Sequence, residues 1–209
     1  MEKTIIYLIR HSEQLKIDGI KRIDEEEQIS NEKIVLSVNG EKKAKELSEL
    51  EELKNIDVIW SSNYVRAIST AKYIAEANNL PINIDSNFNE RKLGNIETLK
   101  ELGKVKNNTF TEEQLLDENL KNMNGESRKE VQKRMNESLD DILKNNLGKR
   151  VAIISHGAAI KFLLMNWCNL NEDCKLVYNN KTIIDLKSPS VIKLEFKENI
   201  LENLILILN

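Results

Sequence analysis

The 209-residue chain is long enough to bury one sizeable hydrophobic core, and 40% hydrophobic and 31% charged residues are typical of a globular protein. The net charge of -3 at pH 7 is too small to favour nucleic acid or an anionic membrane surface as a partner. No apolar run reaches the length of a membrane span, and the first residues do not form a secretory signal, so we expect a cytoplasmic protein. The two cysteines form neither a disulfide framework nor a paired metal-ligand motif.

The first half of the chain alternates between predicted strands and helices. Residues 4–9 are nearly all apolar, which is typical of a strand buried on both faces of a parallel sheet. Ser37 is a plausible helix N-cap, because apolar residues at helical spacing follow it. Pro81 near the start of an alternating run favours a further strand. The predicted elements are strands at 4–9, 57–62 and 80–85, a helix within 36–55 and a helix at 64–79.

The second half opens with a weakly patterned stretch, and we expect a small helical insertion or cap at roughly 97–126. After it come a helix at 126–146, ended by Gly148, a buried strand at 150–155 and a helix at 158–168. The tail contains strand-like runs, with a turn predicted at Glu198-Asn199. This alternation predicts a three-layer α/β/α sandwich with a mostly parallel central sheet, built as one domain over residues 1–209.

The only two histidines of the chain, His11 and His156, each follow an apolar strand directly. Ligands of open parallel sheets bind in the crevice at the carboxyl ends of the strands. Arg10 at the end of the first strand and Arg66, shortly after the second, should reach the same crevice, and guanidinium groups match phosphate oxygens well. Gly157 leaves room for a ligand beside the backbone at the start of a helix. The sequence therefore predicts a site for a phosphate group.

Four segments resemble, in order, the signature blocks of the histidine phosphatase superfamily, the phosphoglycerate-mutase-like proteins. They are LIRHSEQ, SSNYVRAISTA, NERKLGNIE and SHGAAIKF. LSVNGEKKAKEL is similar to the family's first helix, and NGESRKEVQKRM to its loop and helix after the insertion. The resemblance extends from Thr4 to about Leu164. Four blocks in the right order are specific, whereas a single Arg-His pair is not.

The resemblance implies a role for each matching residue. His11 would be the nucleophile that takes the phosphoryl group, with Arg10, Arg66, His156 and Gly157 around the phosphate. Glu90 would give a proton to the leaving oxygen, and no metal or cofactor is implied. The physical chemistry agrees, because imidazole attacks only when neutral and flanking arginines disfavour its protonated form. Phosphoryl transfer needs mainly positioning and charge neutralisation.

The chain departs from the family pattern at several positions. Ser12 stands where a glycine usually follows the nucleophile, and Asn63 replaces the proline of the second block. Ile17 lies near the place of a frequent asparagine, and Ile96 stands where a tryptophan is expected, followed by Glu97. These changes leave the phosphoryl chemistry intact and affect the substrate pocket.

Other interpretations of these residues are weaker. Each histidine by itself could be an ordinary strand-end residue, and Glu13 or Glu97 could be mistaken for the acid. No G-x-S-x-G elbow supports a serine hydrolase, so Ser62 and Ser155 are interpreted as turn or cap residues. Cys168 and Cys174 lie beyond the helix that follows His156, which favours unreactive thiols over a cysteine nucleophile or a zinc site.

The function predicted is a metal-independent phosphomonoester hydrolase that acts on a small phosphorylated metabolite through a phosphohistidine. One alternative is a phosphoglycerate mutase, which the short segment between Glu90 and His156 disfavours, since mutases usually carry a longer insertion that excludes water. Another is a regulatory module that binds a phosphorylated ligand without turnover. The predicted partner is a phosphate ester, with neither nucleic acid nor membrane. The apolar tail, residues 201–208, is either a core strand or an edge that pairs with a second copy in a homodimer.

Overall fold

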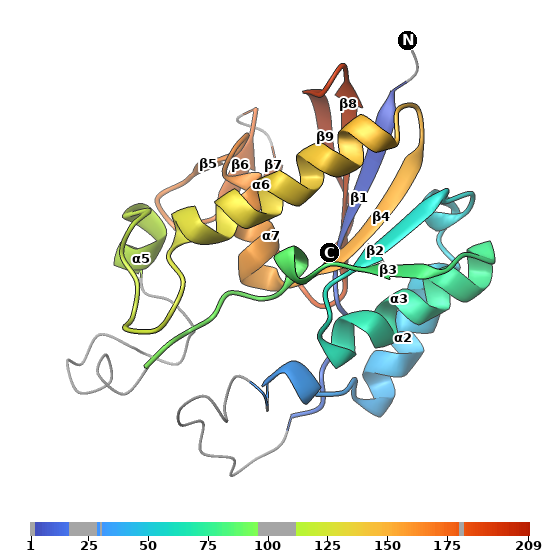
Figure 1. Ribbon diagram of the computed structural model, residues 1–209, viewed down its shortest axis with the longest axis horizontal. Coiled ribbons are helices and arrows are strands. Elements are labelled where there is room, and N and C mark those ends of the chain that lie inside the picture. Colours follow the sequence, from blue (N-terminus) through green and yellow to red (C-terminus); the bar gives the residue numbers. More distant parts are fainter. Residues whose placement is uncertain (1–2, 17–28, 30, 96–111, 180–181) are drawn as a thin grey trace.

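The structure, a computed structural model, describes residues 3–16, 29, 31–95, 112–179 and 182–209. Its centre is a six-stranded sheet in the order β3-β2-β4-β1-β8-β9 (Figure 1). The first four strands in this order pair in parallel, and β8 and β9 are antiparallel. The strands are β1 (Thr4–Arg10), β2 (Val58–Ser61), β3 (Ile82–Ile84), β4 (Arg150–Ser155), β8 (Ser190–Lys197) and β9 (Ile200–Leu208).

The central position of β1 explains its continuous apolar sequence. Successive side chains of a strand point to opposite faces of the sheet. Ile6 and Leu8 belong to the core on one face, whereas Tyr7 and Ile9 belong to the core on the other, and all four are fully buried. A strand covered on both faces has no polar face to present.

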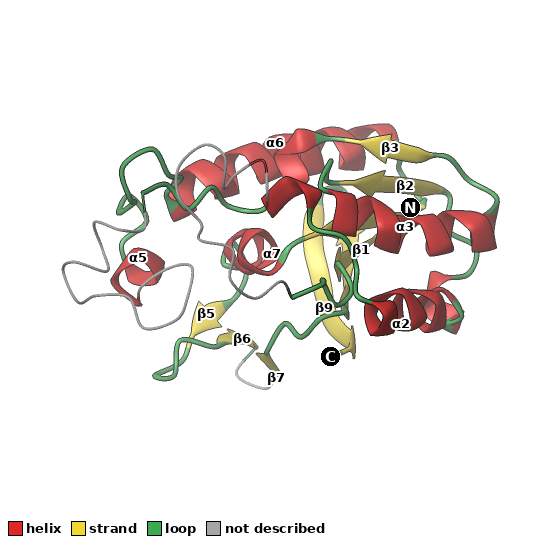
Figure 2. Ribbon diagram, turned by 90° about the horizontal axis from the view of Figure 1, so that it is seen from below, coloured by secondary structure: helices red, strands yellow, loops and turns green. Residues whose placement is uncertain are grey.

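Helices cover both faces of the sheet, and the predicted three-layer α/β fold is confirmed (Figure 2). On one side lie α2 (Val38–Ser48) and α3 (Val65–Asn78), and on the other α6 (Arg128–Asn145) and α7 (Gly157–Leu164). The Ser37 hydroxyl accepts from the Gly40 N–H, as predicted for an N-cap. Ser127 and Glu130 form a capping box at the start of α6. The remaining helical segments are η1 (Glu51–Leu53), η2 (Ser86–Phe88) and α5 (Glu112–Leu116).

The chain after α7 differs from the prediction. The helix ends at Leu164 rather than at Cys168, and three short strands then form a separate sheet in the order β5-β6-β7. They are β5 (Asn169–Leu170), β6 (Leu176–Tyr178) and β7 (Thr182–Ile184). Strands of two or three residues are too short for a periodic pattern, so the sequence indicated only the last of them.

The C-terminal hairpin agrees with the predicted turn. Glu198 and Asn199 have φ angles of 50° and 64°, the left-handed conformation that tight hairpins require. The following strand, β9, is an edge of the sheet, although Leu204 is buried in the core. The predicted insertion at roughly 97–126 lies partly outside the described residues, and α5 falls within its described part. Among the described residues, no helix combines the length and apolar character needed to cross a membrane.

Candidate active site

Three residues singled out in the sequence meet where neighbouring parallel strands end. His11 follows β1, His156 follows β4, and Arg66 lies in the first turn of α3, shortly after β2. They are almost completely buried, with exposed fractions of 4%, 0% and 2%. The centroids of the two imidazole rings are 5.0 Å apart. The structure thus brings the predicted residues together at the expected edge of the sheet.

The hydrogen bonds of His11 determine which ring nitrogen carries the proton. Nδ1 lies 2.7 Å from the Ser12 carbonyl oxygen, which can only accept, so Nδ1 carries the hydrogen. Nε2 accepts from Arg66 Nε, at 3.1 Å, and therefore holds the lone pair of the neutral ring. Burial first, and then the Arg66 and Arg10 guanidinium groups, hold the pKa of His11 well below its usual value. Imidazole in this state is a nucleophile.

Ser12, which stands in place of the usual glycine, forms hydrogen bonds to α2 and α3. Its hydroxyl donates to the Gly40 carbonyl oxygen at 2.7 Å, and its backbone N–H donates to Thr70 Oγ1 at 2.9 Å. The backbone of α2 lies close to the loop after β1 at Gly40, where a Cβ would overlap the Glu13 carbonyl oxygen. Ser12 therefore joins the loop after β1 to α2 and α3, and its side chain is turned toward α2.

His156 makes a different set of contacts. Its Nε2 lies 2.8 Å from the Ser62 hydroxyl, and the Tyr64 ring packs edge-on at 4.7 Å between centroids. Burial, followed by His11 and Arg66, lowers the pKa of His156 well below its usual value. Within the described part of the chain, His156 Nδ1 and Arg10 Nε are buried without a hydrogen-bond partner. Buried polar atoms normally have partners, and the oxygens of a ligand could supply them.

Arg10 and Gly157 lie against each other beside His156. A Cβ added to Gly157 would lie 3.2 Å from the Arg10 Cζ, so the guanidinium packs directly on this backbone. Arg10 also donates to the carbonyl oxygen of Leu186, in the segment between β7 and β8. Gly157 thus makes room for Arg10.

Glu90 lies at the N-terminal turn of α7. Its carboxylate accepts from the N–H groups of Ala158 and Ala159 at 3.3 and 3.0 Å. Arg134 of α6 fixes the preceding loop by donating to the Asn87 and Glu90 carbonyl oxygens, and it pairs with Glu126 at 2.9 Å. No sequence pattern indicated a role for Arg134, because its contact with this loop depends on the packing of α6.

A family model described as the histidine phosphatase superfamily (branch 1) matches residues 6–199. The chain belongs to the histidine phosphatase superfamily. The family predicted from the four sequence blocks is therefore confirmed. No curated protein sequence matches the chain.

Several solved structures have the same fold as this chain. A mycobacterial glucosyl-3-phosphoglycerate phosphatase is 16% identical with a TM-score of 0.71, covering 99% of this chain and 98% of that one. YhfR of Bacillus stearothermophilus is 21% identical with a TM-score of 0.67, covering 99% and 96%. A phosphoserine phosphatase mutant of Entamoeba histolytica, in complex with phosphoserine, is 22% identical with a TM-score of 0.65, covering 96% of each chain.

The other candidate residues that the sequence indicated lie in different settings. Glu13 accepts from Ser37, Asn39 and Lys43, and these hydrogen bonds lower its pKa to about 2, the Lys43 bond most strongly. It is thereby held at the start of α2. Glu97 lies outside the described residues.

The predicted turn and thiol residues are also placed. Ser155 donates to the Phe88 carbonyl oxygen, a structural contact. Ser62 accepts from the Tyr64 N–H, as a turn residue does, but it also contacts His156, which the sequence did not indicate. Burial raises the pKa of Cys168 to about 11, which makes its thiol a poor nucleophile. The described ranges contain no group of three or more His, Cys, Asp or Glu side chains placed to hold a metal ion.

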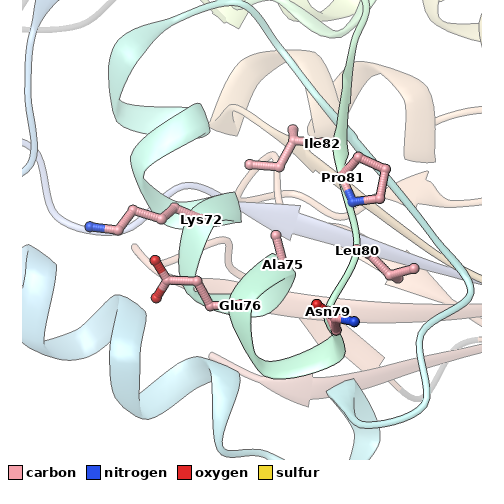
Figure 3. A pocket seen from close by; sticks show the side chains of 7 residues that line it. All are labelled: Lys72, Ala75, Glu76, Asn79, Leu80, Pro81 and Ile82. Atoms are coloured by element: carbon pink, nitrogen blue, oxygen red, sulfur yellow. The ribbon is translucent and has the colours of Figure 1, made fainter.

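A surface hollow of about 510 Å³ lies at the other end of α3 from Arg66 (Figure 3). It is formed by the end of this helix and the start of β3, far along the helix from the strand ends that carry the histidines. Its lining residues are Lys72, Ala75, Glu76, Asn79, Leu80, Pro81 and Ile82.

Proposed function

We propose that the protein is a phosphomonoester hydrolase that acts on a small phosphorylated metabolite through a phosphohistidine on His11, without a metal ion. The observation that carries this proposal is the lone pair of His11 Nε2, which faces Arg66 Nε and lies beside a second buried histidine. Superfamily membership supports phosphatase chemistry, and so do the names of two of the similar structures.

In the first step, His11 Nε2 attacks phosphorus and the bond between phosphorus and the ester oxygen breaks. Arg66 then donates to phosphate oxygens instead of to Nε2, and Arg10 and His156 neutralise the remaining charge. The Ser12 carbonyl oxygen, which accepts from Nδ1–H, stabilises the positive charge that develops on the ring. Glu90, when protonated, gives its proton to the leaving oxygen, and the alcohol departs.

In the second step, water attacks the phosphohistidine and the bond between phosphorus and nitrogen breaks. Glu90 is then a carboxylate and accepts a proton from the water. Inorganic phosphate leaves, and His11 is again neutral with its lone pair on Nε2. Both steps balance with water as the only co-reactant.

The test is release of phosphate from an aryl phosphate in the presence of EDTA. We expect turnover by the wild-type protein and a loss of about 10³-fold or more in His11→Ala, as for other nucleophile deletions. Acid-labile phosphate on the wild-type protein should disappear in the same variant. Wild-type activity in His11→Ala would overturn the proposal.

A panel of phosphorylated metabolites should then identify the substrate. Efficient interconversion of 3- and 2-phosphoglycerate with little release of phosphate would replace the hydrolase by a mutase. Phosphate binding without turnover of any ester would replace it by a binding module.

We propose that the protein is cytoplasmic, in keeping with its free Cys168 and Cys174.

We also propose that the chain forms a homodimer through the outer edge of β9. Edge strands are usually protected by charges or proline, but residues 204–208 of β9 read LILIL. Antiparallel pairing of two β9 strands around a two-fold axis closes the assembly. Sedimentation should give a dimer, and Ile207→Lys should give a monomer. A monomeric wild-type protein would contradict this pairing.

A further inference from the structure

Behind His156, on the side opposite to the unpaired Nδ1, a short chain of hydrogen bonds extends through two other residues. His156 Nε2 lies 2.8 Å from Ser62 Oγ, and Ser62 Oγ lies 2.8 Å from Asn89 Oδ1. Ser62 and His156 are fully buried. These hydrogen bonds thus connect Asn89, the residue before Glu90, through Ser62, directly after β2, to His156.

The direction of these hydrogen bonds follows from a backbone group. The Asn63 N–H donates to Asn89 Oδ1 at 3.1 Å, and a backbone N–H can only donate. The atom that faces Ser62 is therefore the amide oxygen of Asn89, which can only accept. Two oxygens 2.8 Å apart need a hydrogen between them, so the Ser62 hydroxyl donates to Asn89.

The Ser62 hydroxyl has only one hydrogen, so it must accept from its other neighbours. One is the Tyr64 N–H at 3.1 Å, and the other is His156 Nε2, which must therefore carry a hydrogen. A neutral His156 then has its lone pair on Nδ1, the buried atom for which the described residues offer no partner. In this state Nδ1 cannot donate to a phosphate oxygen.

We propose that Ser62 and Asn89 are positioning residues that make the site bind its phosphate group together with one proton. Because the hydrogen on Nε2 is donated to Ser62, His156 can form a hydrogen bond with a phosphate oxygen only if a proton lies between Nδ1 and that oxygen. The proton arrives either on a singly protonated phosphate or on an imidazolium. A phosphate dianion therefore takes up one proton when it binds. This inference rests on the proposed phosphate site and adds its protonation state.

The charges around His156 are consistent with a neutral ring in the empty site. Arg10 at the end of β1, Arg66 in α3 and Arg134 in α6 are the cations around it. Burial first, and then His11 and these three arginines, lower its pKa. Glu90 and Asp185 are the acidic groups that act on Arg10. Glu90 accepts from the backbone N–H groups of Arg91, Ala158 and Ala159. A phosphate that enters among these cations supplies the negative charge that favours proton uptake.

Nitrogen-15 NMR of the imidazole rings tests the hydrogen positions directly, because the chain has only two histidines. In the wild-type protein without ligand, one ring should carry its hydrogen on Nδ1 (His11) and the other on Nε2 (His156). Asn89→Leu removes the acceptor of the Ser62 hydroxyl, which then donates to His156 Nε2. The hydrogen of His156 should move to Nδ1 in this variant. A hydrogen on His156 Nδ1 in the wild-type protein would overturn the inference.

The pH dependence of inorganic phosphate binding tests the consequence. Above the second ionisation of phosphate, the uptake of one proton raises Kd about tenfold for each pH unit. In Asn89→Leu, a neutral Nδ1–H can donate to the dianion, so the slope of log Kd against pH should be shallower by one proton. Ser62→Ala, which removes the hydroxyl itself, should show the same change and replaces Asn89→Leu if that variant does not fold.

The matched control is Asn87→Leu, the same substitution two residues away. The Asn87 side chain donates to Ser138 and takes no part in the contacts of His156. The slope of log Kd against pH in Asn87→Leu should therefore equal that of the wild-type protein. Equal slopes in wild type and Asn89→Leu would overturn the inference while leaving the proposed function in place. A wild-type protein that binds no phosphate at any pH would overturn the proposed function itself.

Discussion

Two histidines whose ring centroids lie 5.0 Å apart are given opposite hydrogen positions by their neighbours. A carbonyl oxygen, that of Ser12, keeps the hydrogen of His11 on Nδ1 and leaves the lone pair on Nε2, where it accepts from Arg66. A hydroxyl that already donates elsewhere, that of Ser62, keeps the hydrogen of His156 on Nε2. These opposite hydrogen positions suit the two roles that we propose, a nucleophile for His11 and a phosphate-binding group for His156.

Glu90→Gln should slow the hydrolysis of alkyl phosphates far more than that of aryl phosphates. A glutamine keeps the size of the side chain but has no proton to give to the leaving oxygen. Alkyl phosphates need that proton, so we expect their kcat to fall by about 10²–10⁴-fold. Aryl phosphates have good leaving groups and should lose far less in the first step. Steady-state kinetics on one substrate of each kind measures this, and equal losses would mean that Glu90 is not the acid.

The acid limb of the pH profile of kcat/KM should lie below the usual pKa of histidine, about 6.5. In the proposed mechanism His11 attacks only when it is neutral, so activity should be lost as the pH falls through its pKa in the folded protein. Burial, Arg66 and Arg10 lower that pKa, and the limb moves to lower pH with it. Arg66→Met removes one of these cations and should move the limb upward. Profiles of kcat/KM for an aryl phosphate test both shifts, and an unchanged limb would contradict the assignment.

At the scale of the elements, α6 holds the loop that carries Glu90. Arg134 extends from this helix to the carbonyl oxygens of the loop and to Glu126. Arg134→Gln should loosen the loop and lower kcat for alkyl phosphates by about tenfold or more, while aryl phosphates are less affected. Lys133→Gln, on the exposed side of the same helix, is the control. A loss shared equally by both substrates would indicate a general disturbance instead.

The elements themselves were largely predictable. Apolar runs and the cap at Ser37 determine strands and helices locally, and the rule that parallel strands share a carboxyl edge predicted that His11 and His156 lie together. The contacts of Ser62 with Asn89 and of Arg134 with the Glu90 loop depend on how distant segments pack. The direction of the Ser12 hydroxyl likewise follows from the approach of α2, which no local pattern encodes.

At the scale of the whole molecule, the two histidines lie at the sheet edge between two hydrophobic cores, which pack on opposite faces of the sheet. Both imidazoles are therefore removed from water without an acidic side chain among the causes that shift their pKa values. Such burial keeps the rings neutral, and it also links the stability of the fold to pH.

That link predicts how the protein responds to acid. The pKa of each histidine is lowered in the folded state, so below about pH 6.5 the unfolded chain binds protons that the folded chain does not. Stability is unaffected above that pH and should fall below it by up to about 1.4 kcal/mol per pH unit for each histidine. Glu13, with its pKa lowered to about 2, reduces the stability only at lower pH, where its carboxylate becomes protonated.

Urea unfolding without phosphate, at about pH 7.5 and about pH 5.5, measures this loss. The variant His11→Asn should lose about half as much stability over the interval as the wild-type protein, because one of the two linked groups is gone. The double variant His11→Asn/His156→Asn should show almost none. Both variants are compared with themselves at the two pH values, so a change in their overall stability does not affect the result. A wild-type protein equally stable at both pH values would contradict the neutral, buried state of the two rings.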